Sequence, residues 1–208
     1  MKRLLLATLP LAIGLLAVAP SAQAITYDLT SDHVTGGAGT PPFGTVSVTQ
    51  NGANVDIVVD LADGYSFVKT GAADDQAFKF NGTGVALGDI TVDAHTPTLV
   101  ASTGAFNGDG TGNFAFGINA PSQGPGGSDP FTDNIVFHVA NATIADLTAP
   151  NALGVIFVAD ILAPNGNTGP VDVSGPPDTV PDSGSTFALM CLGLLGIGLG
   201  ASRRRKVA

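Results

Sequence analysis

The stretch TVSVTQNGANVDIVVDL, residues 45–61, decides the fold class, because it places two runs of alternating residues on either side of an Asn-Gly pair. In the second run, apolar side chains recur at every other position, at Val55, Ile57, Val59 and Leu61. This two-residue period is typical of a strand with one buried face. Asn51 and Gly52 both tolerate positive φ and are a strong signal for a tight turn. We therefore predict an antiparallel hairpin with Asp56 and Asp60 on its solvent face.

Short segments of the same kind recur along the chain between turn-forming residues. They lie at 25–30, 65–69, 77–81, 90–92, 98–102, 113–118, 135–139, 153–161 and 171–173. Turns at roughly ten-residue spacing are typical of a sandwich or barrel. We predict an all-β fold, a jelly-roll-like or Ig-like β-sandwich over residues 25–163, with one helical turn at 143–147 capped by Thr143 and Asp146. The Pro-, Gly- and Asn-rich segment 164–179 is predicted to be a linker.

Charge is distributed unevenly over the 208 residues. Six of the eight Lys and Arg residues lie at the two ends, so residues 25–180 hold two lysines, Lys69 and Lys79, against sixteen aspartates, a net charge of −14. A surface this acidic repels nucleic acid and anionic lipid and excludes both as partners of the middle. The single cysteine, Cys191, lies in a C-terminal apolar run, so the middle can form neither a disulfide nor a cysteine-based zinc site.

The first 24 residues have the three parts of a secretory signal peptide. A positive start at Lys2 and Arg3 is followed by an apolar stretch at 4–18 and a small-residue cleavage site at Ala22-Gln23-Ala24. We therefore expect export through the Sec machinery and cleavage by signal peptidase directly after Ala24.

The C-terminal segment 180–208 combines a short motif, an apolar run and a basic tail. The motif, at 180–186, begins with Val180, Pro181, Asp182, Ser183 and Gly184; residues 187–201 are apolar, and the tail at 202–208 contains Arg203, Arg204, Arg205 and Lys206. As a helix the apolar run spans about 22 Å, short of a roughly 30 Å hydrocarbon core. Four adjacent positive charges are nevertheless retained on the cytoplasmic side. We therefore predict a transmembrane helix in the inner membrane, with the domain outside and the basic stop inside.

This order of motif, apolar helix and Arg-rich tail resembles the PEP-CTERM sorting signal, and residues 180–184 resemble its VPDSG variant. In that family the signal is recognised by an exosortase, a membrane-embedded cysteine protease that is thought to cleave near the motif and release or transfer the domain. The resemblance implies that the exported chain is processed by an exosortase and then delivered to the cell surface or beyond. Many producers form biofilms, which makes exopolysaccharide an implied partner.

The middle of the chain contains no recognisable catalytic motif. His33, His95 and His138 have no metal-ligand or catalytic spacing, and neither a G-x-S-x-G elbow nor an H-E-x-x-H motif occurs. The absence of Glu and Trp argues against a glycosidase site, in which a carboxylic acid depends on an apolar, often aromatic pocket. We therefore expect a non-enzymatic surface or matrix protein without a cofactor.

One loop has oxygen-bearing side chains at alternate positions, as calcium loops do. They are Asn107, Asp109, Thr111 and Asn113. An EF-hand loop that began at Asn107 would need Glu at its twelfth position, where Ile118 stands. A Gly-rich hairpin turn explains the same residues, and we favour it. The alternative function is a calcium- or carbohydrate-binding module that links the cell to exopolysaccharide.

Overall fold

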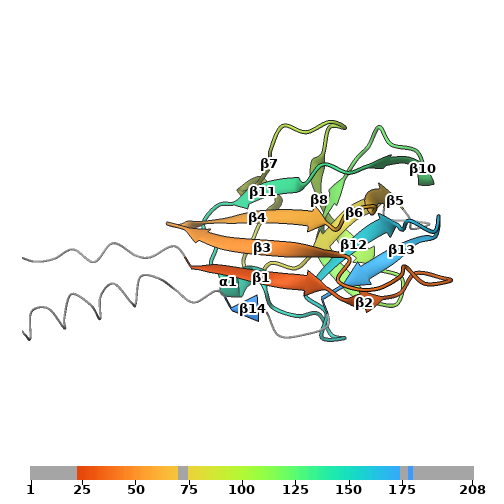
Figure 1. Ribbon diagram of the computed structural model, residues 1–208. Coiled ribbons are helices and arrows are strands. Elements are labelled where there is room, and N and C mark those ends of the chain that lie inside the picture. The colour runs from red at the N-terminus through yellow and green to blue at the C-terminus, as the bar shows by residue number, and fades with distance from the viewer. Residues whose placement is uncertain (1–22, 70–74, 174–177, 180–208) are drawn as a thin grey trace, which may run out of the picture.

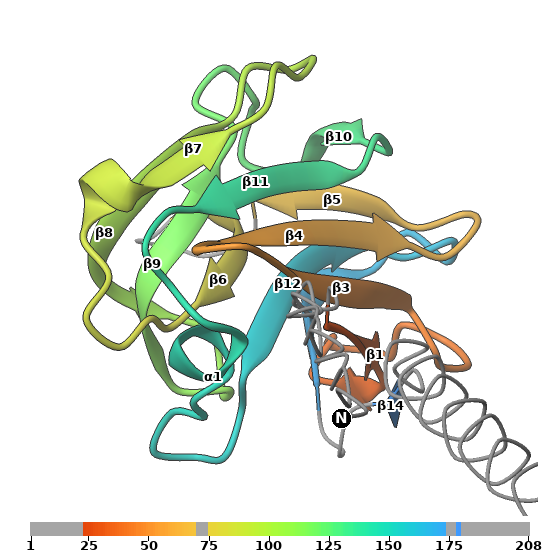
Figure 2. The same cartoon turned by 90° about the vertical axis from the view of Figure 1, so that its left-hand side faces the viewer.

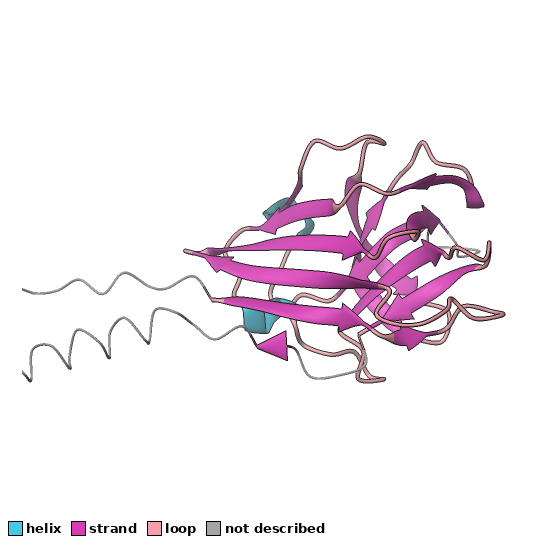
Figure 3. Cartoon of the chain, in the orientation of Figure 1, coloured by secondary structure: helices cyan, strands magenta, loops and turns pink. Residues whose placement is uncertain are grey.

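The computed structural model describes residues 23–69, 75–173 and 178–179. In these ranges the secondary structure is almost entirely β, arranged as two antiparallel sheets (Figures 1 and 3). The predicted all-β class is confirmed. Within the same ranges, no helix combines the length and apolar character needed to cross a bilayer. The predicted transmembrane helix at 187–201 and nearly all of the predicted signal peptide lie outside the described residues.

Sheet A has six strands. In spatial order they are β14 (Asp178–Thr179), β1 (Ala24–Leu29), β3 (Gly44–Asn51), β4 (Asn54–Leu61), β11 (Ile135–Val139) and β7 (Ile90–Val92). The three strands β1, β3 and β4 lie side by side, which differs from the ABED and CFG strand orders of immunoglobulin domains.

Sheet B has eight strands. Its main path runs through β10 (Gly126–Phe131), β5 (Ser66–Lys69), β12 (Phe157–Leu162), β6 (Gln76–Phe80), β9 (Asn113–Asn119) and β8 (Val100–Asn107); β13 (Thr168–Asp172) pairs with β12, and β2 (Ser31–Asp32) pairs with β13. β5 and β6 share one side of β12, while β13 runs along the other. In Figure 2, β7 and β8, the edge strands of the two sheets, lie on the same side of the molecule.

The predicted hairpin at 45–61 is confirmed as β3 and β4. Its register runs from Gly44 opposite Leu61 to Asn51 opposite Asn54. The two-residue loop is Gly52-Ala53, one position later than the Asn-Gly pair predicts, because Gly52 supplies the positive φ of +61° while Asn51 remains in the strand. The alternating apolar residues of both strands are buried, except that Leu61 at the end of β4 is only partly buried, and the two aspartates of β4 lie on the opposite face.

The inner faces of the two sheets form one hydrophobic core. Phe78 and Phe80 of β6 meet Phe137 of β11, with ring centroids 6.0 Å and 5.0 Å apart, and Tyr27 of β1 meets Phe157 of β12 at 5.5 Å. Each of these contacts joins a residue of sheet A to a residue of sheet B. Because aromatic side chains bury large apolar areas, this group accounts for much of the attraction between the sheets.

The predicted helical turn is present as α1 (Ile144–Leu147), and a second turn, the 3-10 helix η1 (Leu87–Asp89), precedes β7. Thr143 is the N-cap of α1: its side chain accepts a hydrogen bond from the Asp146 N–H, and the Asp146 carboxylate accepts one from the Thr143 N–H. This is the reciprocal capping box that the two residues predict.

Several predicted boundaries differ from the structure, two of them for a clear local reason. The strand predicted at 153–161 begins at Phe157, because the Asn151 side chain accepts hydrogen bonds from the N–H groups of Leu153 and Val155 and closes a turn there. The predicted linker at 164–179 contains β13 and, at its end, β14, so the folded domain extends past its predicted end at residue 163. Val171 and Val173 are core residues, and their burial stabilises β13 against β12 despite the Pro- and Gly-rich composition.

Candidate functional site

The first strand of the domain, β1, and the last described strand, β14, lie next to each other in sheet A (Figure 1). β14 is antiparallel to β1, with Ile25 opposite Thr179. On its other side, β1 pairs with β3 along its whole length. β1 therefore lies between β3 and β14, and Thr179, the last residue of β14, directly precedes the predicted sorting motif.

The predicted signal-peptide cleavage bond, between Ala24 and Ile25, lies inside this ladder. Ala24 is opposite Thr49, and the backbone N–H of Gln50 donates to the carbonyl oxygen of Gln23 at 2.8 Å. A protease that binds its substrate as an extended strand competes with β3 for the same backbone groups. We therefore expect signal peptidase to act before β1 joins the sheet.

The other residues predicted for export and sorting lie outside the described ranges. They are Ala22 of the signal peptide, Val180, Pro181, Asp182, Ser183 and Gly184 of the motif, and Arg203, Arg204, Arg205 and Lys206 of the basic stop. The strands that follow the signal peptide and precede the motif, β1 and β14, are neighbours in sheet A.

A histidine joins two aspartates on the outer face of sheet A. His138 Nδ1 lies 2.7 Å from Asp56 Oδ1, and His138 Nε2 lies 3.0 Å from Asp93 Oδ1. The hydrogen bond to Asp56 raises the pKa of His138; partial burial opposes this rise, and the charge of Asp93 adds to it. The same hydrogen bond is the main cause that lowers the pKa of Asp56. The cluster is therefore a pH-dependent link between β4, β11 and the chain after β7.

Ser31, His33 and Asp172 also converge, on β2, the following loop and β13. His33 Nε2 lies 3.1 Å from Ser31 Oγ and 2.8 Å from Asp172 Oδ2. In a Ser-His-Asp triad the two ring nitrogens have separate partners, one for the nucleophile and one for the carboxylate. Here one nitrogen serves both contacts, so the imidazole does not relay a proton from serine to carboxylate. The arrangement ties the edge strand β2 to β13.

The loop considered for calcium closes the β8–β9 hairpin, with Asn107 opposite Asn113. The Asn107 Oδ1 accepts a hydrogen bond from the Asp109 N–H at 2.9 Å, and the buried Thr111 hydroxyl donates to the Gly108 carbonyl oxygen at 2.7 Å. Two of the four candidate side chains are thus engaged within the turn. In the described part of the chain, no group of three or more His, Cys, Asp or Glu residues is placed to hold a metal ion. Calcium binding by this loop stays a prediction.

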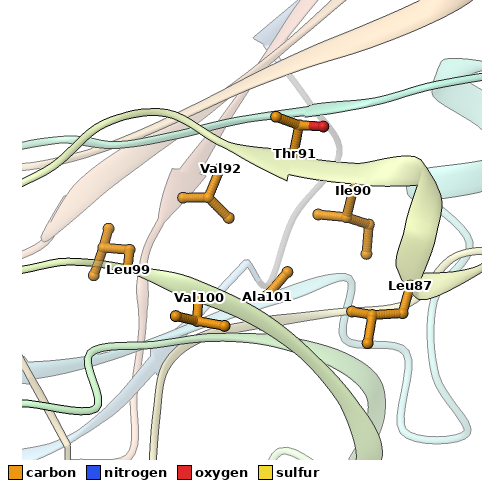
Figure 4. Close-up of a pocket in the computed structure, with 7 residues that line it drawn as sticks. All are labelled: Leu87, Ile90, Thr91, Val92, Leu99, Val100 and Ala101. Carbon is orange, nitrogen blue, oxygen red and sulfur yellow. The ribbon is translucent and has the colours of Figure 1, made fainter.

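An open groove of about 360 Å³, lined mainly by apolar side chains, lies between β7 and β8 (Figure 4). It is lined by Leu87, Ile90, Thr91, Val92, Leu99, Val100 and Ala101. Leu87 and Val100 are 40% and 46% exposed. Thr91 supplies the only side-chain hydroxyl of this lining, and no charged side chain belongs to it. The groove therefore lacks the converging polar groups that characterise ligand and active sites.

Residues 179–206 match the family model of the VPDSG-CTERM motif. The match begins at Thr179, so β14, the last strand in the described residues, ends where the signal begins. The chain is thus an exported protein that carries a C-terminal sorting signal. That signal is the VPDSG variant of the PEP-CTERM type, which implies an exosortase-type processing partner and a location in the cell envelope or at the surface. No curated protein and no solved structure matches the chain.

Proposed function

We propose that this chain is a non-enzymatic surface or extracellular-matrix protein, in which the β domain is the cargo and the C-terminus is the substrate of the exosortase. The observation that carries the proposal is the continuity of β14 with the matched signal. Proteases bind substrates as extended strands, and the chain reaches the motif in extended conformation from the edge of sheet A.

The proposal includes a transient stage in the inner membrane. Residues 187–201 would span the membrane and the basic tail would stay in the cytoplasm, because clusters of Lys and Arg are retained there. The acidic domain would then stand outside, where a net charge of −14 between residues 25 and 180 keeps it soluble.

Two features of the described residues support a role without catalysis. The groove between β7 and β8 has no charged residue in its lining, and the one Ser-His-Asp cluster described above shares a single imidazole nitrogen between serine and carboxylate. General-base catalysis of the triad kind needs both nitrogens.

The sorting half of the proposal is tested in the native host with the double variant Pro181→Ala/Asp182→Ala. We expect the wild-type protein to have a mass that begins at Ile25 and ends close to the motif, and the variant to keep its C-terminus and stay in the membrane fraction. The matched control is Pro121→Ala/Asp133→Ala, which changes the same residue types at exposed positions of the domain. Wild-type processing of the motif variant would refute the proposal.

The cargo half has its own test. Residues 174–208, fused to an unrelated exported domain, should be sufficient for the same C-terminal cleavage in the native host. Residues 1–173, exported without the sorting signal, should be cleaved only after Ala24, should be found outside the cytoplasm and should not accumulate in the membrane fraction. If cleavage requires the β domain as well, the domain is part of the recognition and not only cargo.

A further inference from the structure

Two oppositely charged side chains meet on the outer face of sheet B, shielded from solvent. Lys79 of β6 and Asp160 of β12 are each 1% exposed, and Lys79 Nζ lies 2.8 Å from Asp160 Oδ2. Lys79 is directly opposite Val158 in the β6–β12 ladder, so Asp160, two residues further along β12, is its diagonal neighbour on the same face. Strand pairing therefore fixes both ends of this contact.

The burial of this pair is costly as long as both groups are ions. Residues 25–180 contain only two lysines, and the fold removes one of them from solvent. The lost hydration of a buried ion pair often exceeds the attraction between its charges, so that apolar replacements are frequently as stable. A gain in stability from the ion pair is therefore a weak explanation for the burial of Lys79 and Asp160. A reaction between them that removes both charges explains the burial directly.

We propose that the Lys79 amine and the Asp160 carboxyl group condense to an intramolecular isopeptide bond. The Lys79 nitrogen attacks the Asp160 carboxyl carbon; the Nζ–Cγ bond forms, and one carboxyl oxygen leaves as water with two protons of the ammonium group. No oxidant, reductant or cofactor is consumed, and two opposite charges become one neutral amide. Its remaining N–H keeps an acceptor, because the Gln76 carbonyl oxygen already accepts from Lys79 Nζ at 3.2 Å.

The position of the bond suits an exported domain that has no disulfide. The only cysteine of the chain is in the C-terminal apolar run, so no disulfide braces the β strands outside the cytoplasm. Lys79 and Asp160 are 81 residues apart, and a cross-link that closes a long loop restricts the unfolded chain most. β12 pairs with β13, β5 and β6, so the amide would fasten β6 to the central strand of sheet B.

The intact mass of the mature protein, purified from its native host, measured in denaturant and compared with the sequence between its own two termini, tests the proposal. The protein should be lighter than its sequence by one water molecule, trypsin should not cut after Lys79, and digestion should release a branched peptide that joins Lys79 to Asp160. Succinimides at Asp63-Gly64 or Asp109-Gly110 also lose one water. They hydrolyse in mild base, whereas the amide persists, so the mass is measured after that treatment.

Three variants test whether the lost water molecule comes from Lys79 and Asp160. Lys79→Arg keeps the positive charge but replaces the amine, Asp160→Ala removes the carboxyl group, and both proteins should have their full sequence mass. Lys69→Arg changes the other lysine of the domain and should remain one water lighter. A wild-type protein with full sequence mass and ordinary tryptic cleavage after Lys79 overturns the proposal. Because the wild-type mass decides by itself, a variant that fails to fold does not remove the test.

Discussion

Ile25 and Thr179 are cross-strand partners at the edge of sheet A, so the predicted first residue of the mature domain lies opposite the residue at which the sorting signal begins. The two predicted processing points, one for each end of the chain, are therefore neighbours on one sheet. β14 also covers the start of β1, which would otherwise be an open edge available for pairing with other chains. Cleavage within the motif leaves β14 in place, and the processed domain keeps this cover.

Removal of β14 should weaken the domain without unfolding it. A truncated form that begins at Ile25 and ends at Pro177 lacks the pairing of β14 with Ile25 and Thr26. Each lost hydrogen bond contributes roughly 0.5–1.5 kcal/mol to the stability of the longer form. We expect a free energy of unfolding about 1–2 kcal/mol below that of a form ending at Thr179, measured by urea denaturation. Equal stability of the two lengths would contradict a role for β14.

Phe78 should be among the most sensitive core positions. It is fully buried and contacts the rings of Phe80, Phe137 and Phe157, so it touches both sheets. Phe78→Ala should lower the free energy of unfolding by about 3–5 kcal/mol, because it removes apolar contact and leaves a cavity. Leu153→Ala, at a side chain that is 64% exposed, should stay within about 0.5 kcal/mol of wild type. Similar losses for both variants would contradict the core assignment.

Strands with local alternation could be predicted from sequence, whereas strands that depend on a partner could not. β7 and β11 have the predicted bounds, because alternating apolar residues and flanking turns define them. β10 has the sequence GGSDPF, which contains no alternation and includes Pro130; it exists through irregular pairing with β5. β13 lies wholly within the predicted linker, although the pattern indicates a short strand at 171–173, because its conformation depends on its ladder with β12.

The sorting signal could be predicted because its parts are contiguous: a motif, an apolar run and a basic tail in fixed order. The polar clusters of the domain could not be predicted from the sequence, because their residues are far apart in the chain. Lys79 and Asp160 are separated by 81 residues, and His33 and Asp172 by 139. Such contacts depend on the order of strands in sheet B, and no local pattern specifies that order.

Gly44 should not tolerate a side chain. It pairs with Leu61 at the end of the β3–β4 ladder, and a Cβ atom there would overlap the Asp60 carbonyl oxygen and lie 2.9 Å from the Leu61 Cα. Because backbone atoms cannot move aside without breaking the ladder, Gly44→Ala should cost roughly 1–3 kcal/mol of unfolding free energy. Gly88→Ala is the matched control, since a Cβ atom at Gly88 meets nothing within 4 Å. A thermal-unfolding series that ranks the two variants equally would contradict this close approach.

His138 should make the stability of the domain depend on pH. Its pKa is raised from an ordinary 6.5, mainly by the hydrogen bond to Asp56. A group with a raised pKa binds its proton more tightly in the folded state, so its stabilising contribution is complete below pH 6.5 and is lost as the pH rises through the raised pKa. The His138 side chain is 40% exposed, and solvent screening limits the contribution to about 1 kcal/mol or less.

Urea denaturation of the wild type and of His138→Gln, repeated across pH, measures this contribution. The free energy of unfolding of the wild type should exceed that of the variant most on the acidic side of neutrality. This difference in stability should shrink as the solution becomes alkaline. It should shrink again in strong acid, because the pKa of Asp56 is lowered from 3.8 and its contribution is lost as the pH falls through that lowered value. His95→Gln is the control, since the His95 nitrogens contact backbone oxygens of Pro97 and Asp133 and no carboxylate. A difference that grows with rising pH would mean that the neutral imidazole, and not its protonated form, is the state that the two aspartates stabilise.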